Sequence, residues 1–105
     1  MADLSPAELA DRLDAVQLID VREPDEWDAG RIGGARLVPL GELSAAAESI
    51  DRAVPAVFVC RSGTRSAMAA EAFAGAGYDA HNLAGGLQAW VAAGLPLEPA
   101  DGHVA

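Results

Sequence analysis

The most informative segment of this sequence is residues 55–66, which read Pro55-Ala56-Val57-Phe58-Val59-Cys60 and then Arg61-Ser62-Gly63-Thr64-Arg65-Ser66. The first half is apolar and β-branched without polar alternation, the pattern of a strand covered on both faces. The second half is a polar turn that leads into a helical pattern over residues 65–74. A buried strand, a tight loop and a helix in this order predict the centre of a parallel α/β sheet.

Strand and helix patterns alternate on both sides of this unit. We expect strands over residues 16–21 and 78–83, and helices from residue 6 to about 13, over 42–50, and from 86 to 94. The first helix has a clear start signal, because Ser5 and Glu8 form a capping box around Pro6. The alternation predicts a three-layer α/β/α domain with a mainly parallel central sheet.

Apolar spacing also predicts which helical side chains face the core. They are Trp27 in a helical turn after Pro24, Met68, Ala69, Ala72 and Phe73 in the helix over 65–74, and Leu87, Trp90 and Val91 in the last helix. The three large aromatic residues of this set are expected to serve the core and not a cofactor.

Length and composition narrow the class of protein. The 105 residues are 51% hydrophobic, which excludes a disordered chain. We expect one domain over residues 1–105, with an acidic tail that frays from about residue 99. A single cysteine excludes a disulfide scaffold.

Charge and hydropathy indicate where the protein acts. The formal net charge is −9, and all seven basic residues are arginines without a basic run, so we expect no nucleic-acid partner. No apolar run approaches the roughly 18 residues of a membrane span, so we expect no membrane partner either. The first residues lack the pattern of a secretory signal, which predicts a cytoplasmic protein.

The residues after Cys60 have the composition of an anion cradle. At the end of a strand, Gly63 permits a positive φ, so that successive N–H groups can point at one spot beside the positive end of a helix dipole. Cys60 stands at that spot, and donors of this kind would lower the pKa of a thiol from its usual value of about 8.5. We therefore interpret Cys60 as a nucleophile. The alternative is one more small buried residue at the end of a core strand.

Four motifs, in order, resemble those of the rhodanese-like sulfurtransferase domains in their single-domain form. They are Leu18–Glu23 with Glu26-Trp27, Gly30–Ala35, Cys60–Ser66, and Leu83–Leu87 with Trp90, Gly94 and Pro96. The resemblance covers nearly the whole chain, and four ordered motifs are far more specific than one. In the second motif, members often carry His in place of Arg31 and Pro in place of Gly33, which bears on the shape of that loop.

The resemblance implies a transferase of the thiosulfate sulfurtransferase type. Sulfane sulfur would pass from a small anionic donor, thiosulfate or a persulfide, to Cys60, and then to cyanide, a thiol or a protein acceptor. The N–H groups of the cysteine loop, which is Arg61, Ser62, Gly63, Thr64 and Arg65, would hold the Cys60 persulfide without a general base, cofactor or metal. With no second cysteine in the chain, the acceptor must be external.

Four charged residues complete the predicted site. Arg61 and Arg65 would attract the dianionic donor and support the departing sulfite. Arg65 opens the helix, where its charge opposes the helix dipole, so an anion-binding or loop-bracing role is favoured over a solvated side chain. Asp20 and Arg22 end the first predicted strand and are expected to brace loops through an ion pair.

Two other functions stay open. The domain could be a noncatalytic module for sulfur relay or regulatory binding. It could also be a phosphatase or arsenate reductase on the related fold, where five residues separate Cys from Arg. Here four residues separate Cys60 from Arg65, which predicts a smaller ring of N–H groups, suited to a single sulfur and not to a tetrahedral oxyanion.

Overall fold

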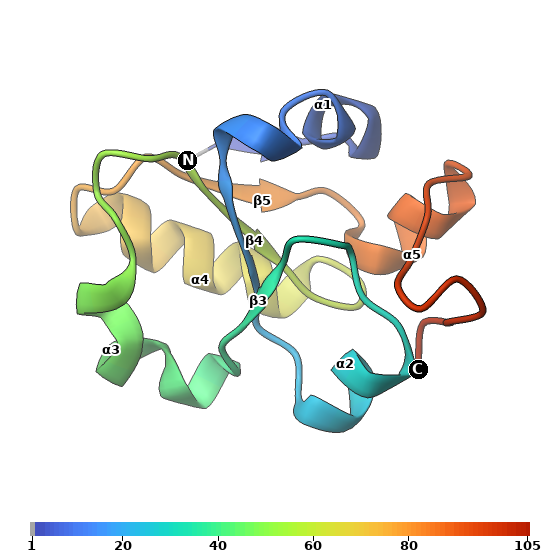
Figure 1. Ribbon diagram of the computed structural model, residues 1–105. Helices are drawn as coiled ribbons and strands as arrows, with labels where there is room; N and C mark the ends of the chain where they lie inside the picture. Colours follow the sequence, from blue (N-terminus) through green and yellow to red (C-terminus); the bar gives the residue numbers. More distant parts are fainter. Residues whose placement is uncertain (1) are drawn as a thin grey trace.

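The computed structural model describes residues 2–105, which form a five-stranded sheet in the order β1-β5-β4-β2-β3 with every pair parallel (Figure 1). The strands are β1 (Ala2–Leu4), β2 (Gln17–Asp20), β3 (Arg36–Leu37), β4 (Ala56–Val59) and β5 (Ala80–Leu83). The central place of β4, with every residue buried, confirms the prediction from its apolar sequence. The sequence did not predict β1, because three residues are too few to show a period.

Five α-helices connect or flank the strands in residues 2–105. They are α1 (Pro6–Ala10), α2 (Pro24–Ala29), α3 (Leu43–Ala46), α4 (Thr64–Gly75) and α5 (Gly86–Ala92). The capping box of α1 is present in both directions, between Ser5 and Glu8. The helix expected over 42–50 is a short α3 between the 3-10 turns η2 (Leu40–Glu42) and η3 (Ala47–Ser49). No helix among the described residues is long and apolar enough to cross a membrane.

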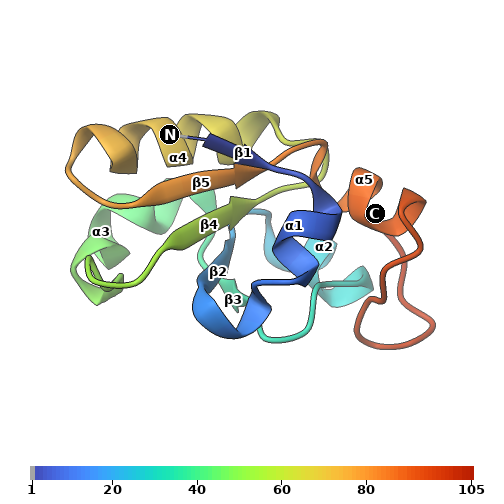
Figure 2. The same ribbon diagram turned by 90° about the horizontal axis from the view of Figure 1, so that it is seen from above.

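The helices lie on both faces of the sheet, which confirms the three-layer architecture (Figure 2). One apolar cluster packs α3 and α4 against the sheet and includes Phe58 of β4. The other lies on the face of α1 and α5 and includes Val57 and Val59 of β4. Successive β4 side chains therefore enter opposite clusters, which explains why this strand is apolar throughout.

Two helices are rotated relative to the predicted inward faces. Met68 is 55% exposed, Val91 is 44% exposed and Ala72 is also exposed, so the prediction that they face the core was wrong. The α4 residues that are buried are Ser66, Ala69, Ala70 and Phe73. This set has the spacing of one helical face, but it includes a serine that apolar spacing alone passes over.

Trp27 is only half-buried, which corrects its predicted place in the core. It lies on α2, a helix without a fully buried residue, and the guanidinium of Arg31 stacks over its ring at 5.1 Å from the ring centroid. Trp90 and Phe73 are buried as expected.

The segment after residue 99 packs against the domain, in contrast to the frayed tail that its acidic composition predicted. The His103 N–H donates to the Ala29 carbonyl at 2.9 Å, and Val104 contacts the apolar cluster under α1 and α5. Just before it, Arg31 and Glu98 exchange two backbone hydrogen bonds. Backbone hydrogen bonds and the contact of one apolar side chain therefore hold this segment against the domain despite its acidic composition.

The start of α5 lies against the chain that leaves β4. The Leu87 N–H donates to the Cys60 carbonyl at 2.9 Å, and the Gln88 N–H donates to the Arg61 carbonyl at 3.0 Å. This approach depends on Gly86, whose φ is +62°. A Cβ at this position would lie 2.6 Å from both carbonyl oxygens. Gly86 is therefore the residue that lets α5 hold the cysteine loop in place.

We predict that Gly86→Ala lowers the free energy of unfolding by clearly more than the roughly 1 to 2 kcal/mol of a left-handed residue alone, because backbone atoms must also move. The matched control is Gly94→Ala, since Gly94 has a φ of +79° with open space around it. Denaturant unfolding of both variants measures the difference. Equal losses would contradict a role for the close approach.

Candidate active site

Cys60 follows β4 directly and lies at the carboxyl edge of the sheet, where parallel α/β folds place their ligands. The residue is 1% exposed. The Gly63 N–H donates to Sγ at 3.1 Å, and the Ser66 hydroxyl oxygen lies 3.2 Å from Sγ. Gly63 has the positive φ that the sequence predicted, at +97°. The chain thus turns back on itself to place backbone donors on the thiol.

Opposing effects act on the Cys60 thiol. Burial raises its pKa, while the N–H groups of Ser66, Gly63 and Ser62 lower it, as does the Ser66 hydroxyl when its proton points to Sγ. The net effect is a pKa below the usual value of a thiol. The site therefore favours the thiolate, which is the nucleophilic form of cysteine.

Arg65 makes a bidentate ion pair with Glu26 of α2, with oxygen–nitrogen distances of 2.8 and 2.9 Å. The hydrogen bonds that Arg65 donates to Glu26 hold the pKa of Glu26 at about 2, and the same ion pair raises the pKa of Arg65. In the sequence no acidic residue lies between Arg52 and Glu71. The tertiary structure brings a carboxylate to this locally basic stretch from a distant helix.

The other members of the cysteine loop are more exposed. Arg61, Ser62 and Thr64 have exposed side chains, and the Arg61 Nε donates to the Ala105 carbonyl at 2.9 Å. The structure therefore brings the backbone of the loop to Sγ, whereas the Arg61 side chain extends toward the last residues of the chain.

Asp20 and Arg22 form a buried ion pair at 2.8 Å. The Arg22 guanidinium also donates to the carbonyls of Gly30, at 2.8 Å, and Glu26, at 3.2 Å. It therefore ties the end of β2 to the middle of α2 and to the residue that follows this helix. Since α2 carries Glu26, this network reaches Arg65 at the start of α4.

Two residues near the thiol had no role in the sequence-based prediction. Glu26 belonged to a motif but had no assigned partner, and Asn82 of β5 accepts a hydrogen bond from the Ser66 hydroxyl at 2.6 Å. Asn82 is 4% exposed. The signal that could have identified it is a polar residue between the apolar residues Ala80 and Leu83, which, like Asn82, are buried in β5.

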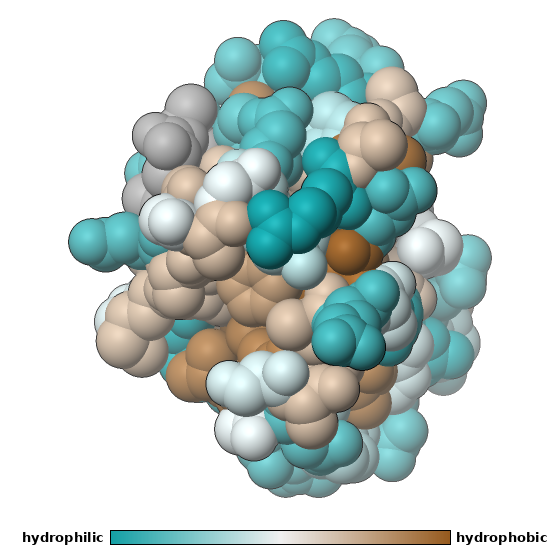
Figure 3. All heavy atoms as spheres, turned by 90° about the vertical axis from the view of Figure 1, so that its left-hand side faces the viewer, coloured by the Kyte–Doolittle hydropathy of each residue, from teal (hydrophilic) through white to brown (hydrophobic). Residues whose placement is uncertain are grey.

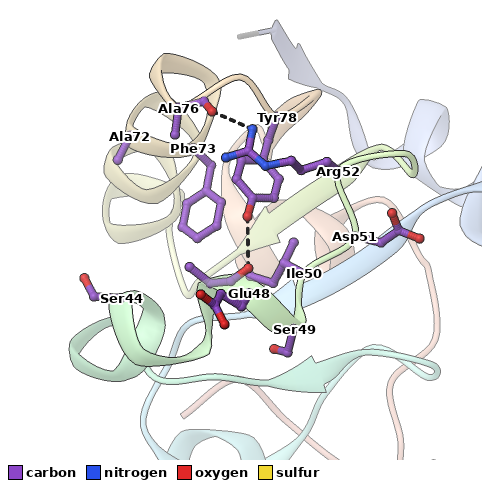
Figure 4. Close-up of a pocket in the computed structure, with 11 residues that line it drawn as sticks. Ser44, Glu48, Ser49, Ile50, Asp51, Arg52, Ala72, Phe73, Ala76 and Tyr78 are labelled. Carbon is purple, nitrogen blue, oxygen red and sulfur yellow. Dashed lines mark hydrogen bonds between the residues drawn. The ribbon is translucent and has the colours of Figure 1, made fainter.

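A hollow lies away from Cys60, on the face shown in Figure 3, where apolar residues gather among hydrophilic ones. It has a volume of about 850 Å³ and lies between η3 and the last turns of α4 (Figure 4). Tyr78 donates to the Ala47 carbonyl and Arg52 donates to the Ala76 carbonyl at its edge. No residue of the cysteine loop lines this hollow, so it forms no part of the candidate site.

A family model described as "Rhodanese-like domain" matches residues 5–93. The chain is also 33% identical over 87 residues to the thiosulfate sulfurtransferase GlpE of Pseudomonas putida, in a match that covers 82% of this chain and 78% of that protein. It is 41% identical over 93 residues to the probable adenylyltransferase/sulfurtransferase MoeZ of Mycobacterium tuberculosis. That match covers 83% of this chain but only 24% of the length of MoeZ.

Solved structures give the same picture of the fold. A rhodanese-related protein from Thermoplasma volcanium superposes with a TM-score of 0.89 at 30% sequence identity. The superposition covers 92% of this chain and 97% of that one.

We predict that Glu26→Gln removes roughly 1 to 2 kcal/mol of stability at neutral pH, a value reduced for the partial exposure of the pair. The folded-state pKa of Glu26, about 2, lies below its unfolded-state pKa of about 4.3. The pair therefore stabilises the protein fully at pH values above about 4.3. This contribution is lost as pH falls from about 4.3 toward 2. The difference between wild type and variant should therefore shrink over this range.

Denaturant unfolding at a series of pH values measures this difference. Asp25→Asn is the control, because it removes an exposed carboxylate from the same helix. A difference between wild type and Glu26→Gln that stays constant down to pH 2 would contradict the predicted linkage.

Proposed function

The chain belongs to the rhodanese-like domain family, and on that premise we propose that it moves sulfane sulfur from thiosulfate, through a persulfide on Cys60, to an external thiol or cyanide. Family membership and the relatives named as sulfurtransferases support a sulfurtransferase-type function. The donor, the acceptor and the persulfide are our proposal, as is the role of each site residue.

The environment of Cys60 is the observation that carries the proposal. The thiol directly follows a fully buried strand, and Gly63 directs an N–H group at Sγ from 3.1 Å. Its pKa is below the usual range of a thiol, although burial alone would raise it. A buried structural cysteine has no need of such donors, whereas a nucleophile requires them.

In the first half-reaction the Cys60 thiolate attacks the outer sulfur of thiosulfate. A bond forms between Sγ and that sulfur, the bond between the two sulfurs of thiosulfate breaks, and sulfite leaves with the electron pair. The negative charge then rests on the outer sulfur of the Cys60 persulfide, where N–H groups of the cysteine loop stabilise it. No proton is transferred, so no general base is needed.

In the second half-reaction an acceptor attacks the outer sulfur of the persulfide. Cyanide would leave as thiocyanate, and a thiolate would leave as a new persulfide, while the Cys60 thiolate is regenerated. Because the chain has one cysteine, no thiol of its own can resolve the intermediate. The acceptor is therefore a separate molecule or a partner protein.

The burial of Cys60 favours a slender donor. The residue is 1% exposed, so a donor must present a narrow end, as thiosulfate does with its single outer sulfur. The short loop also disfavours a phosphate ester, because a tetrahedral oxyanion needs a wider ring of donors. We propose that the reaction takes place in the cytoplasm, where a lone thiol stays reduced.

We predict that incubation of the purified protein with thiosulfate adds the mass of one sulfur atom, and that cyanide removes it with release of thiocyanate. Intact-protein mass spectrometry measures both steps. Cys60→Ser should neither gain the sulfur nor form thiocyanate. A wild-type protein that gains no mass with thiosulfate, but does so with a thiol persulfide, would overturn thiosulfate as the donor and keep the Cys60 carrier.

A second prediction concerns Arg65. If its charge attracts the dianion, Arg65→Ala should raise the KM for thiosulfate several-fold, and Glu26→Gln should lower it, because the guanidinium loses its competing carboxylate. If the pair only braces the loop, both variants should impair turnover in the same direction. Steady-state thiocyanate formation distinguishes the two outcomes, with retained thermal unfolding as the check on folding.

A further inference from the structure

A line of polar side chains runs from the edge of the sheet to the thiol. Asp3 of β1 and Asn82 of β5 are register partners in the parallel sheet, and the Asn82 Nδ2 donates to the Asp3 carboxylate at 3.3 Å. The Asn82 Oδ1 accepts the hydroxyl proton of Ser66 at 2.6 Å, and Ser66 Oγ lies 3.2 Å from the Sγ of Cys60. Ser66 and Asn82 are buried, at 0% and 4% exposed.

Asp3 fixes the orientation of the Asn82 amide. A carboxylate only accepts hydrogen bonds, so it faces the NH₂ of the amide and turns the carbonyl toward Ser66. A rotated amide would set the Asn82 oxygen against the Asp3 oxygen. The orientation of one buried amide therefore depends on an exposed side chain at the edge of the sheet.

The Ser66 hydroxyl has one proton and two neighbours that could take it. The Asn82 oxygen is the closer, at 2.6 Å against 3.2 Å for Sγ. If the proton points to Asn82, Ser66 faces Sγ with a lone pair, which can accept from the thiol but repels the thiolate. If the proton points to Sγ, the Ser66 Oγ and the Asn82 Oδ1 lie 2.6 Å apart with no proton between them, and the two oxygens repel each other.

We propose that Asp3 and Asn82 form a relay that holds the Ser66 proton away from Cys60, so that backbone N–H groups alone stabilise the thiolate. Asp3 and Asn82 are positioning residues here, since neither touches Sγ. The relay acts on the thiol that carries the proposed sulfur transfer, and its role in catalysis rests on that proposed function. A thiolate with fewer donors is more basic, and a more basic thiolate is the stronger nucleophile.

Other charged groups around the thiol do not depend on the relay. Arg65 of α4 faces this region but is paired with Glu26 of α2, and Asp20 of β2 is paired with Arg22. The N–H donor of Gly63 belongs to the backbone and stays when side chains are replaced. Changes in Asp3 or Asn82 therefore leave these neighbours in place.

The test is a pH titration of the thiolate by its ultraviolet absorbance in wild type, Asp3→Asn, Asn82→Ala and the double variant. Cys60 is the single cysteine, so subtracting the titration of Cys60→Ser, which keeps the absorbance of Tyr78, leaves a signal from Cys60 alone, and no sulfur donor is needed. We expect Asn82→Ala to lower the midpoint by about one pH unit, because Ser66 becomes free to donate to the thiolate. Asp3→Asn should lower it by less, and should add nothing in the Asn82→Ala background.

The double variant separates the relay from simple charge removal. A shift from Asp3→Asn that is equal in both backgrounds would mean a direct effect of the Asp3 charge and would overturn the relay. The direction in which Ser66→Ala shifts the titration midpoint is a second, independent test. This variant should lower the midpoint if the lone pair of Ser66 faces Sγ, whereas a raised midpoint would show that Ser66 donates to the thiolate and would also overturn the proposal.

These outcomes do not depend on sulfur transfer. The titration can succeed in a protein that takes no sulfur from thiosulfate, and it can fail in one that does. Thermal unfolding of each variant checks the fold, and Ser66→Ala, which removes a single oxygen, keeps the proposal testable if Asn82→Ala does not fold.

Discussion

The buried ion pair between Asp20 and Arg22 is the constraint on which the candidate site depends. Both residues are fully buried, and an unpaired charge in this position would cost about 3 to 5 kcal/mol. Arg22 is satisfied only when α2 lies where its Glu26 carbonyl and the following Gly30 carbonyl can accept. The pair therefore fixes α2, and α2 in turn presents the Glu26 side chain to Arg65 at the start of α4.

The environment of the thiol results from competing effects. Burial opposes ionisation of Cys60, and hydrogen bonds to Sγ overcome it. The net charge of −9 is spread over the surface, and the positive charge of Arg65 at the site is largely matched by Glu26. Oriented N–H groups, which carry no net charge, are therefore the main source of stabilisation for an anion here.

Several predictions from the sequence were confirmed because the signal was local. The apolar run over residues 56–59 indicated a strand buried on both faces, and Ser5 with Glu8 indicated the start of α1. Gly63 indicated a left-handed turn after Cys60. The predictions for Trp27 and Met68 were wrong, because apolar character alone does not say how a short helix is rotated against the sheet.

The sequence by itself determined that strands alternate with helices, that the chain turns after Cys60, and that one thiol lies at the end of the central strand. Only the tertiary structure decided what surrounds that thiol. Glu26 lies 39 positions from Arg65, and Asn82 lies 16 positions from Ser66. Hydrogen bonds and ion pairs act over about 3 Å. Their partners are therefore set by how α2 and α4 pack against the sheet and against each other, and no local pattern of residues encodes that.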